Sequence, residues 1–168
     1  VGAIAIDKYN NPLPDETLKI CKESDAVLFG AIGHPKFDNN PKLKIRPEQG
    51  LLKLRKELGL YANLRPVKSY EELLSLSPLK KNIIENVDML FVRELTGGLY
   101  FGEKKSSNTF SSDLCTYTVD EIERVTSIAI DFAKKRRNKI TLVDKANVLE
   151  TSRLWRKTVQ EISLKHPE

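Results

Sequence analysis

The feature that most constrains the fold is the alternation of short apolar runs with segments that show the apolar spacing of helices. Strands are predicted for the apolar runs at residues 26–32, 60–64, 89–92, 99–101 and 140–143. Helices are predicted for the segments that begin near residues 14, 48, 79, 118 and 148. Strands and helices in alternation are typical of an α/β protein with a substantially parallel sheet, which is the fold class we expect.

Local signals mark several boundaries of these elements. Gly59 follows the helical segment 48–58 at the position where a left-handed residue ends a helix. Thr118 and Glu121 have the spacing of a capping box, so a helix is expected to begin after Thr118. The polar stretch 103–113 is expected to form a loop or projecting arm, and residues 1–7 are interpreted as an extended segment.

Composition excludes several classes of protein. The 168 residues are 40% hydrophobic and 30% charged, as in globular proteins, and no apolar run approaches the ~20 residues of a membrane helix. The net charge of +5 includes the run Lys134–Arg137, but this run ends a helix, and no nucleic-acid-binding motif accompanies it. Cys21 and Cys115 form no CxxC motif and indicate no disulfide scaffold, so we expect a reducing, cytoplasmic compartment. Together with the charge pattern and the short apolar runs, this predicts a protein that binds neither nucleic acid nor a membrane.

Polar residues that directly follow predicted strands are the first candidates for a binding site, because ligands of open α/β sheets bind at the carboxyl ends of strands. Three such positions carry cations, Arg65, Arg93 and Lys145, and Arg55 lies on the helix before Arg65. Arginine side chains bind carboxylates through two parallel hydrogen bonds. The four cations together suit a small substrate with two or more carboxylates.

Each of these residues also has a purely structural interpretation. Any of the arginines can be the partner of a surface salt bridge, and Lys145 can pair with its neighbour Asp144. Tyr100, in the predicted strand 99–101, can be a half-buried sheet residue. His34 and His166 are too few and too distant in the sequence to indicate a metal site, so the residues by themselves leave the function open.

Five strings of residues favour the functional interpretation of these side chains over the structural one. They are RPEQGLLKLRK at 46–56, YANLRP at 61–66, RELTGGLYFGE at 93–103, VDKANVLE at 143–150 and WRKTV at 155–159. In their order and spacing they resemble the β-decarboxylating dehydrogenases that act on isopropylmalate, isocitrate, homoisocitrate and tartrate, and most of all the isopropylmalate-using members. The resemblance implies a two-domain α/β fold with a mixed, mostly parallel sheet, flanking helices and a projecting β arm.

The resemblance also implies a division of the chain and a role for each matching residue. Residues 1–60 belong to the larger, nucleotide-binding domain, and residues 61–168 belong to the smaller substrate and dimerisation domain, with the arm at about 98–118. The matches to the family's ligands of the substrate carboxylates are Arg55, Arg65 and Arg93. Tyr100 matches the acid that protonates the enol left by decarboxylation.

Three further matches concern the homodimer, the cofactor and the substrate's third carbon. Lys145 matches the lysine that reaches into the partner subunit's site and assists removal of the hydroxyl proton, and Asn147 matches a residue near the nicotinamide. The side chains that match those facing the substituent on the third carbon are Glu48, Leu51, Leu52 and Val148. Leu51 and Leu52 supply the apolar wall that an isopropyl group needs, whereas a third carboxylate, as in isocitrate, would be desolvated there at high cost.

The resemblance therefore implies NAD-dependent oxidative decarboxylation of 3-isopropylmalate to 4-methyl-2-oxopentanoate, a step of leucine biosynthesis. Tartrate or malate and homoisocitrate remain open as substrates, and without the resemblance Leu51 and Leu52 are interpreted as the core face of a helix. The other implied cofactor is Mg²⁺ or Mn²⁺.

The strings match only a central part of the family's usual chain. The family's glycine-rich opening turn would precede Val1, and its metal-binding aspartates and adenosine-binding loop would follow Glu168, so no metal ligand is expected within the chain. His34 stands where the family commonly has glycine. We expect the 168 residues alone to be inactive, and a second interpretation is an inert truncated fragment that serves as a dimer-forming module.

Overall fold

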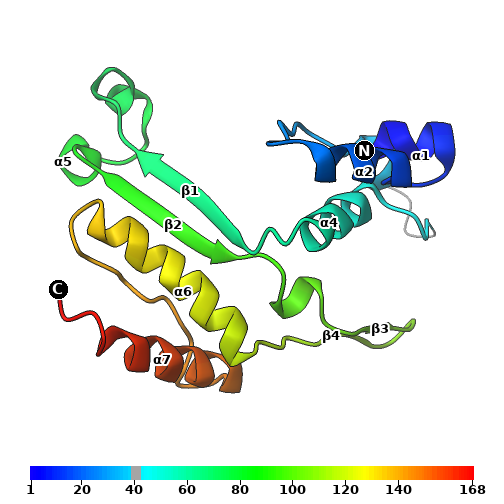
Figure 1. Ribbon diagram of the computed structural model, residues 1–168. Helices are drawn as coiled ribbons and strands as arrows, with labels where there is room; N and C mark the ends of the chain where they lie inside the picture. Colours follow the sequence, from blue (N-terminus) through cyan, green and yellow to red (C-terminus); the bar gives the residue numbers. More distant parts are fainter. Residues whose placement is uncertain (39–42) are drawn as a thin grey trace. The chain divides into compact units, whose positions relative to one another are not determined.

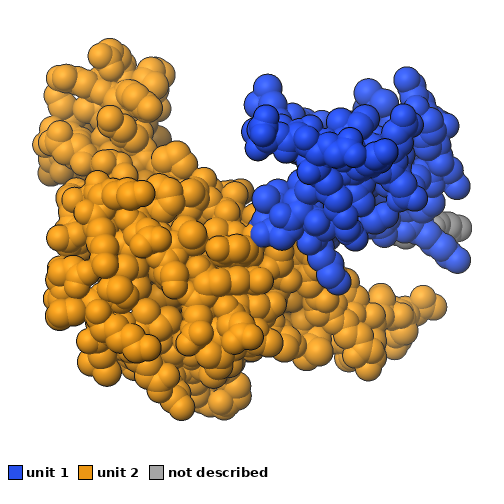
Figure 2. Space-filling model, viewed as in Figure 1, with its two compact units in different colours: residues 1–60 blue, residues 61–168 orange. Residues whose placement is uncertain are grey.

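The chain forms two compact units, Val1–Leu60 and Tyr61–Glu168, which Figure 2 colours separately. The computed structural model describes residues 1–38 and 43–168. Helices and two short sheets make up the secondary structure of these residues, so the predicted α/β class is confirmed. Within the same ranges, no helix is both long enough and apolar enough to span a membrane.

The first unit is helical. Its helices are α1 (Ala3–Tyr9), α2 (Asp15–Glu23), α3 (Pro35–Asp38) and α4 (Pro47–Glu57). Asp15 and Glu16 lie in the first turn of α2, where acidic side chains complement the helix dipole. Helix α4 begins at Pro47 and is followed by Gly59, which has the predicted left-handed conformation with φ +63°. The core of this unit is formed by Leu13, Leu18 and Leu54.

The second unit contains an antiparallel pair of strands and two long helices. Strands β1 (Ala62–Lys68) and β2 (Asp88–Glu94) are joined by residues 69–87, which include the 3₁₀ helix η1 (Glu71–Leu76) and α5 (Lys81–Ile84). Helix α6 (Val119–Lys134) packs against β2, and α7 (Glu150–Ser163) packs against α6 (Figure 1). This order places the carboxyl end of β2 close to the beginning of α6.

The capping box predicted at the start of α6 is present. The Thr118 hydroxyl accepts a hydrogen bond from the Glu121 backbone N–H at 3.3 Å, and the Glu121 carboxylate accepts one from the Thr118 N–H at 2.8 Å. Ile122, Val125 and Ile130 then form the buried side of the helix at helical spacing. The sequence signal and the packing agree here because both depend on residues within a few turns of one helix.

The stretch predicted as an arm forms a hairpin. After the 3₁₀ helix η2 (Gly98–Tyr100), strands β3 (Lys104–Ser106) and β4 (Ser111–Asp113) pair antiparallel and extend away from α6 and α7 (Figure 1). All six paired residues are exposed. The prediction of a short strand at residues 99–101 is wrong, because Tyr100 lies in a tight helical turn and not in an extended segment.

Two predicted strands are also not strands. Residues 26–32 and 140–143 adopt no regular structure, and Leu28 has a relative exposure of 103%. A strand requires a neighbour that takes up its backbone hydrogen bonds, and among the described residues no strand pairs with either run. Apolar composition alone therefore overestimated the number of strands.

The predicted parallel pairing is not found among the described strands, because β1 pairs antiparallel with β2 and β3 antiparallel with β4. A parallel pair needs a connection that crosses one face of the sheet, whereas residues 69–87 return the chain at the end of β1. Residues 1–7 were also predicted wrongly, since they are largely the helix α1. Ala3 and Ala5 are buried and Ile4 is exposed, an alternation that imitates a strand in so short a segment.

Candidate active site

One face of the β1–β2 pair gathers the predicted substrate ligands of the second unit. The register pairs Asn63 with Arg93 and Arg65 with Phe91. Because side chains alternate along a strand, Asn63, Arg65 and Arg93 lie on one face, and Glu94 lies on the face toward α6. The antiparallel register therefore brings together two arginines that are 28 positions apart in the sequence.

Among the described residues, no carboxylate neutralises the charges of these two arginines. Arg65 Nε donates a hydrogen bond to Asn63 Oδ1 at 2.9 Å, and the Arg93 guanidinium carbon lies 5.3 Å from the centre of the Tyr100 ring. In residues 1–38 and 43–168, neither arginine forms an ion pair with an acidic side chain. Two guanidinium groups with uncompensated charge on one exposed face attract a dianionic ligand.

A cavity of about 420 Å³ opens beside Arg93 and Tyr100. It lies between the loop that follows β2 and the segment that leads into α7, and its wall includes Arg93, Tyr100, Cys115, Tyr117, Asp144, Ser152 and Trp155. Tyr100 is 51% exposed, so its phenol is accessible to a ligand in this cavity. The interpretation of Tyr100 as a half-buried sheet residue does not hold.

The Tyr117 side chain packs against Gly97 and Gly98, the two glycines of the loop after β2. Its ring makes an edge-to-face contact with Trp155, with the ring centres 4.8 Å apart. A Cβ atom on Gly98 would lie 2.3 Å from the Tyr117 hydroxyl oxygen, so Tyr117 occupies the space that a side chain would need. Burial raises the pKa of the Tyr117 phenol above its ordinary value of 10.0.

The loop that carries Lys145 is organised by its neighbour Asp144. Two hydrogen bonds from Arg156 to the Asp144 carboxylate, at 2.8 and 2.7 Å, hold the pKa of that carboxyl below its usual value, and a bond from the Ala146 N–H at 2.9 Å adds to the effect. The ion pair of Asp144 is thus formed with Arg156 and not with Lys145. Ser152 Oγ accepts a bond from the Lys145 backbone N–H at 3.1 Å, and the Lys145 side chain is exposed.

Lys145 and the two residues assigned beyond it do not line the cavity. Asn147 and Val148 are exposed on the same short loop between residues 144 and 149, and none of the three belongs to the cavity wall. The structure therefore brings Arg65, Arg93 and Tyr100 together, and leaves Lys145, Asn147 and Val148 as a second group on the neighbouring loop.

The predicted residues of the first unit share one face of α4. Glu48, Leu51, Leu52 and Arg55 follow the spacing i, i+3, i+4 and i+7, which aligns them along one side of a helix. The side that packs into the core is formed by Gly50 and Leu54 instead. Leu51 and Leu52 are half-buried and do not belong to the core cluster, contrary to the purely structural interpretation of these two leucines.

The residues present do not fit a metal ion. In the described parts of the chain, no group of three or more His, Cys, Asp or Glu side chains is arranged to hold one. We therefore assign no step of the chemistry to a metal bound by these residues. The cavity wall includes the carboxylates of Asp144 and Glu94, and each forms an ion pair with an arginine.

Sequence reasoning missed three side chains that shape this site. Glu94 and Tyr117 flank the glycine turn, and Arg124 reaches the turn from α6. Arg124 carries no signal of this role in the sequence, because helical spacing places it with Asp120 and Asp131 on the polar side of α6. No local pattern indicates its partner, which is 30 positions earlier in the chain.

An exposed face with two unneutralised arginines beside an accessible phenol is suited to proton transfer on a carboxylate-bearing substrate. All of residues 1–168 match the model of the isocitrate/isopropylmalate dehydrogenase family. The chain is 54% identical over 167 residues to the 3-isopropylmalate dehydrogenase of Bacteroides fragilis (strain YCH46), covering 99% of this chain and 47% of that protein. It is 52% identical over 173 residues to the 3-isopropylmalate dehydrogenase of Aquifex aeolicus (strain VF5), covering 100% of this chain and 47% of that protein.

Solved structures of dehydrogenases agree with this match. The isocitrate dehydrogenase of Methylococcus capsulatus superposes with a TM-score of 0.74 at 30% identity, covering 99% of this chain and 47% of that one. The apo form of a β-decarboxylating dehydrogenase from Thermococcus kodakarensis superposes with a TM-score of 0.68 at 34% identity, covering 99% and 44%. The chain belongs to the isocitrate/isopropylmalate dehydrogenase family, so the family resemblance is confirmed, and the chain spans about half the length of the curated relatives it matches.

Proposed function

We propose that this chain is part of an NAD-dependent 3-isopropylmalate dehydrogenase of leucine biosynthesis. Such an enzyme converts 3-isopropylmalate and NAD into 4-methyl-2-oxopentanoate, carbon dioxide and NADH. The observation that carries the proposal is the pair Arg65 and Arg93, which form no ion pair within the described residues, on one strand face beside the Tyr100 phenol. Identity above 50% to proteins named 3-isopropylmalate dehydrogenase supports the choice of substrate.

The positions of the residues in the second unit support the roles proposed for them. Arg65 and Arg93 bind the substrate carboxylates, and the Tyr100 hydroxyl donates its proton to the carbon that loses carbon dioxide. The Arg93 guanidinium carbon lies 5.3 Å from the centre of the Tyr100 ring, so the proposed proton donor is next to a proposed carboxylate ligand. Lys145 lies outside the cavity wall of its own chain, which supports a role in the site of the second subunit of a homodimer.

The roles of the first unit concern the remainder of the substrate. Arg55 binds carboxylate, and Glu48, Leu51 and Leu52 lie with it along one side of α4, where the two leucines face the isopropyl group together with Val148. Residues 1–60 belong on this proposal to the nucleotide-binding domain and residues 61–168 to the substrate and dimerisation domain. NAD, near Asn147, accepts the hydride when it is bound, and Mg²⁺ or Mn²⁺ needs ligands beyond those described here.

The location proposed is the cytoplasm, and the 168 residues alone are proposed to be inactive. Cys21 and Cys115 are free thiols, which suits a reducing compartment. The missing metal ligands among the described residues support the proposal that the isolated chain does not turn over substrate.

The test measures NADH formation by the full-length protein that contains these residues. Arg93→Ala is expected to raise KM for 3-isopropylmalate and lower kcat, with a total loss in kcat/KM of about a hundredfold, because one carboxylate loses its guanidinium partner. Arg136→Ala is the matched control, since Arg136 already pairs with Asp88 at 2.7 Å. Unchanged kinetics of Arg93→Ala would remove Arg93 from the site, and faster turnover of isocitrate or tartrate would reassign the substrate.

A further inference from the structure

Glu94 is a buried carboxylate for which the proposed chemistry has no use. Its side chain is 1% exposed, at the last position of β2. It accepts hydrogen bonds from the backbone N–H groups of Thr96 at 2.8 Å and Gly97 at 2.7 Å, and from the Thr96 hydroxyl at 2.6 Å. A buried charge is tolerated only when such bonds replace its hydration, so the turn and the carboxylate depend on each other.

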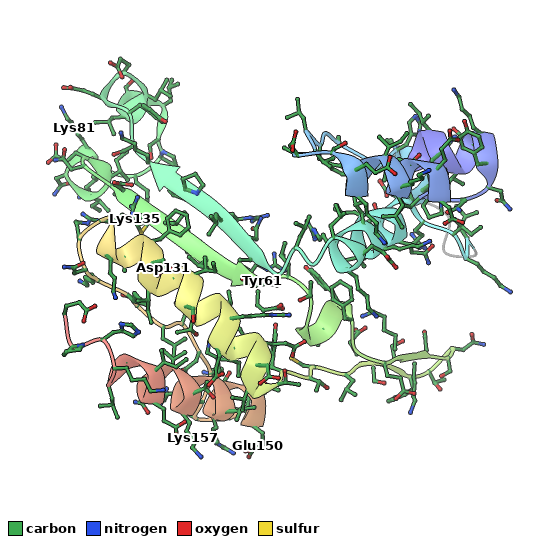
Figure 3. All side chains as sticks on the ribbon, in the orientation of Figure 1. Tyr61, Lys81, Asp131, Lys135, Glu150 and Lys157 are labelled. Carbon is green, nitrogen blue, oxygen red and sulfur yellow. The ribbon has the colours of Figure 1, made fainter. Side chains whose placement is uncertain are left out.

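Arg124 neutralises this carboxylate from helix α6. Its Nη2 atom donates to the Glu94 carboxylate at 3.1 Å and to the Thr96 hydroxyl at 2.6 Å. Its guanidinium carbon lies 4.8 Å from the centre of the Tyr61 ring, which Figure 3 labels beside the beginning of β1. The Tyr61 carbonyl also accepts the Leu95 N–H at 2.8 Å. Arg124 thus joins α6, the residue before β1, and the turn after β2.

The turn held in this way separates the two residues proposed to act on the substrate. Arg93 precedes Glu94 on the strand and is held by the register of β2, whereas Tyr100 follows the turn and lies in the 3₁₀ helix η2. On its other side the turn packs on Tyr117, with the Gly98 N–H donating to the Thr116 carbonyl at 3.0 Å. The geometry of the turn therefore determines where Tyr100 lies relative to Arg93.

We propose that Glu94, together with Arg124, is a positioning residue that holds the Thr96–Gly97 turn and thereby places the Tyr100 phenol against Arg93. The kinetic part of this inference rests on the function proposed above. A proton donor acts only within hydrogen-bond reach of the atom that it protonates, and a displacement of about 1 Å can cost a hundredfold in rate. Glu94 therefore acts on the reaction through Tyr100 without contact with the substrate.

The test compares Glu94→Gln with Asp88→Asn in the full-length protein. In the unmodified protein, both oxygens of the Glu94 carboxylate accept hydrogen bonds from the turn and from Arg124. A glutamine side chain has the same size but only one acceptor oxygen, so we expect the turn to loosen. We expect kcat to fall between about tenfold and a hundredfold, with KM for 3-isopropylmalate changed less than about threefold, because Arg93 stays in its strand. Asp88 begins the same strand and pairs with Arg136, so Asp88→Asn is expected to leave both constants unchanged.

Thr96→Val provides a milder variant. It removes only the hydroxyl between Glu94 and Arg124 and keeps the shape of the side chain, and we expect kcat to fall about fivefold. Kinetics are measured per folded molecule, with circular dichroism reporting the folded fraction. A kcat equal to that of the unmodified protein in both folded variants would contradict the proposal, since a merely structural role changes stability alone.

A second measurement is independent of catalysis. Because the Tyr100 ring centre lies 5.3 Å from the Arg93 guanidinium carbon, we expect the ring to shift the NMR signals of the Arg93 side chain upfield. Glu94→Gln is expected to reduce this shift and Asp88→Asn to preserve it, and an unchanged shift in folded Glu94→Gln would overturn the positioning role. If the unmodified protein does not oxidise 3-isopropylmalate, the proposed function fails, and the NMR result alone decides the role of Glu94.

Discussion

Two loops of the second unit carry proposed functional residues and are built on the same plan. The first loop, residues 94–100, ends at Tyr100, and the second loop, residues 144–149, contains Lys145. Each loop begins with a carboxylate that accepts the N–H two residues further on, at 2.8 Å for Glu94 and 2.9 Å for Asp144. In each, an arginine of the following helix neutralises the carboxylate.

The loops differ in what surrounds this shared arrangement. Glu94 is 1% exposed, follows a paired strand, and its loop packs through two glycines on Tyr117. Asp144 is 9% exposed, its partner Arg156 is 51% exposed, and the apolar run before Asp144 pairs with none of the described strands. The first loop is therefore held by packing as well as by charge, whereas the second is held mainly by charge. We therefore expect the loop at 94–100 to be sensitive to substitutions that disturb its packing, and the loop at 144–149 to be sensitive to loss of the carboxylate charge.

The largest expected effect comes from breaking the packing of the first loop. In Gly98→Ala the new Cβ would lie 2.3 Å from the Tyr117 hydroxyl oxygen, at a residue with φ +69°. We expect the free energy of unfolding to fall by about 3 kcal/mol, from the left-handed backbone and the steric clash together. Urea denaturation measures this change.

Gly59→Ala is the matched control for this substitution. Gly59 has φ +63°, but no atom lies within 4 Å of the position of its Cβ, so only the backbone cost of about 1 kcal/mol is expected. An equal loss for the two alanine variants would show that Tyr117 does not lock the turn, and the contrast between the loops would disappear.

The second loop is expected to open in acid. Hydrogen bonds from Arg156, and then from the Ala146 N–H, lower the pKa of Asp144 below 3.8, so the folded state releases its proton more readily than the unfolded chain. The resulting stabilisation is complete above pH 3.8 and is lost as the pH falls through the lower folded value. We expect the Ala146 amide signal to titrate with a midpoint below 3.8.

Asp144→Asn tests the same contact at neutral pH. We expect the Ala146 amide to exchange with solvent about tenfold faster, because a charged acceptor is lost, while the Thr96 amide keeps its rate. A change in both amides would mean that the loops are not independent.

The smallest expected effect appears in alkali and belongs to the first loop. Burial raises the pKa of Tyr117 above 10.0, so the unfolded chain loses this proton before the folded chain does. Stability is therefore unaffected below pH 10.0 and falls as the pH rises above it. The urea midpoint should decline less between pH 9 and about pH 11 in Tyr117→Phe, whereas Tyr9→Phe, at an exposed tyrosine, should behave like the unmodified chain.

Much of the helical structure could be predicted from the sequence, because its signals are local. Gly59 and the Thr118–Glu121 pair marked a helix end and a helix start correctly. The strands were harder to predict. The runs 26–32 and 140–143 have the composition of strands but no partner among the described strands, and the seven residues of α1 are too few to distinguish a helical from a strand period.

The residues of the candidate site could also be predicted only in part. Arg65, Arg93 and Tyr100 were identified from the sequence, and the structure gathers them around one exposed strand face and the cavity beside it. The environment of Glu94 could not be predicted, since its burial depends on Arg124, 30 positions away, and on Tyr61 beneath the guanidinium. The pairing of Asp144 with Arg156 instead of Lys145 likewise depends on the approach of α7.

By itself, the sequence determined the family, the α/β class and the helices with their caps, because these are properties of strings of residues and of contacts within a few helical turns. The tertiary structure alone decided which apolar runs became strands, in which direction they pair, and which carboxylates lost their contact with water. The physical reason is that a strand and a buried charge are stable only with a partner, and the partner comes from a distant part of the chain.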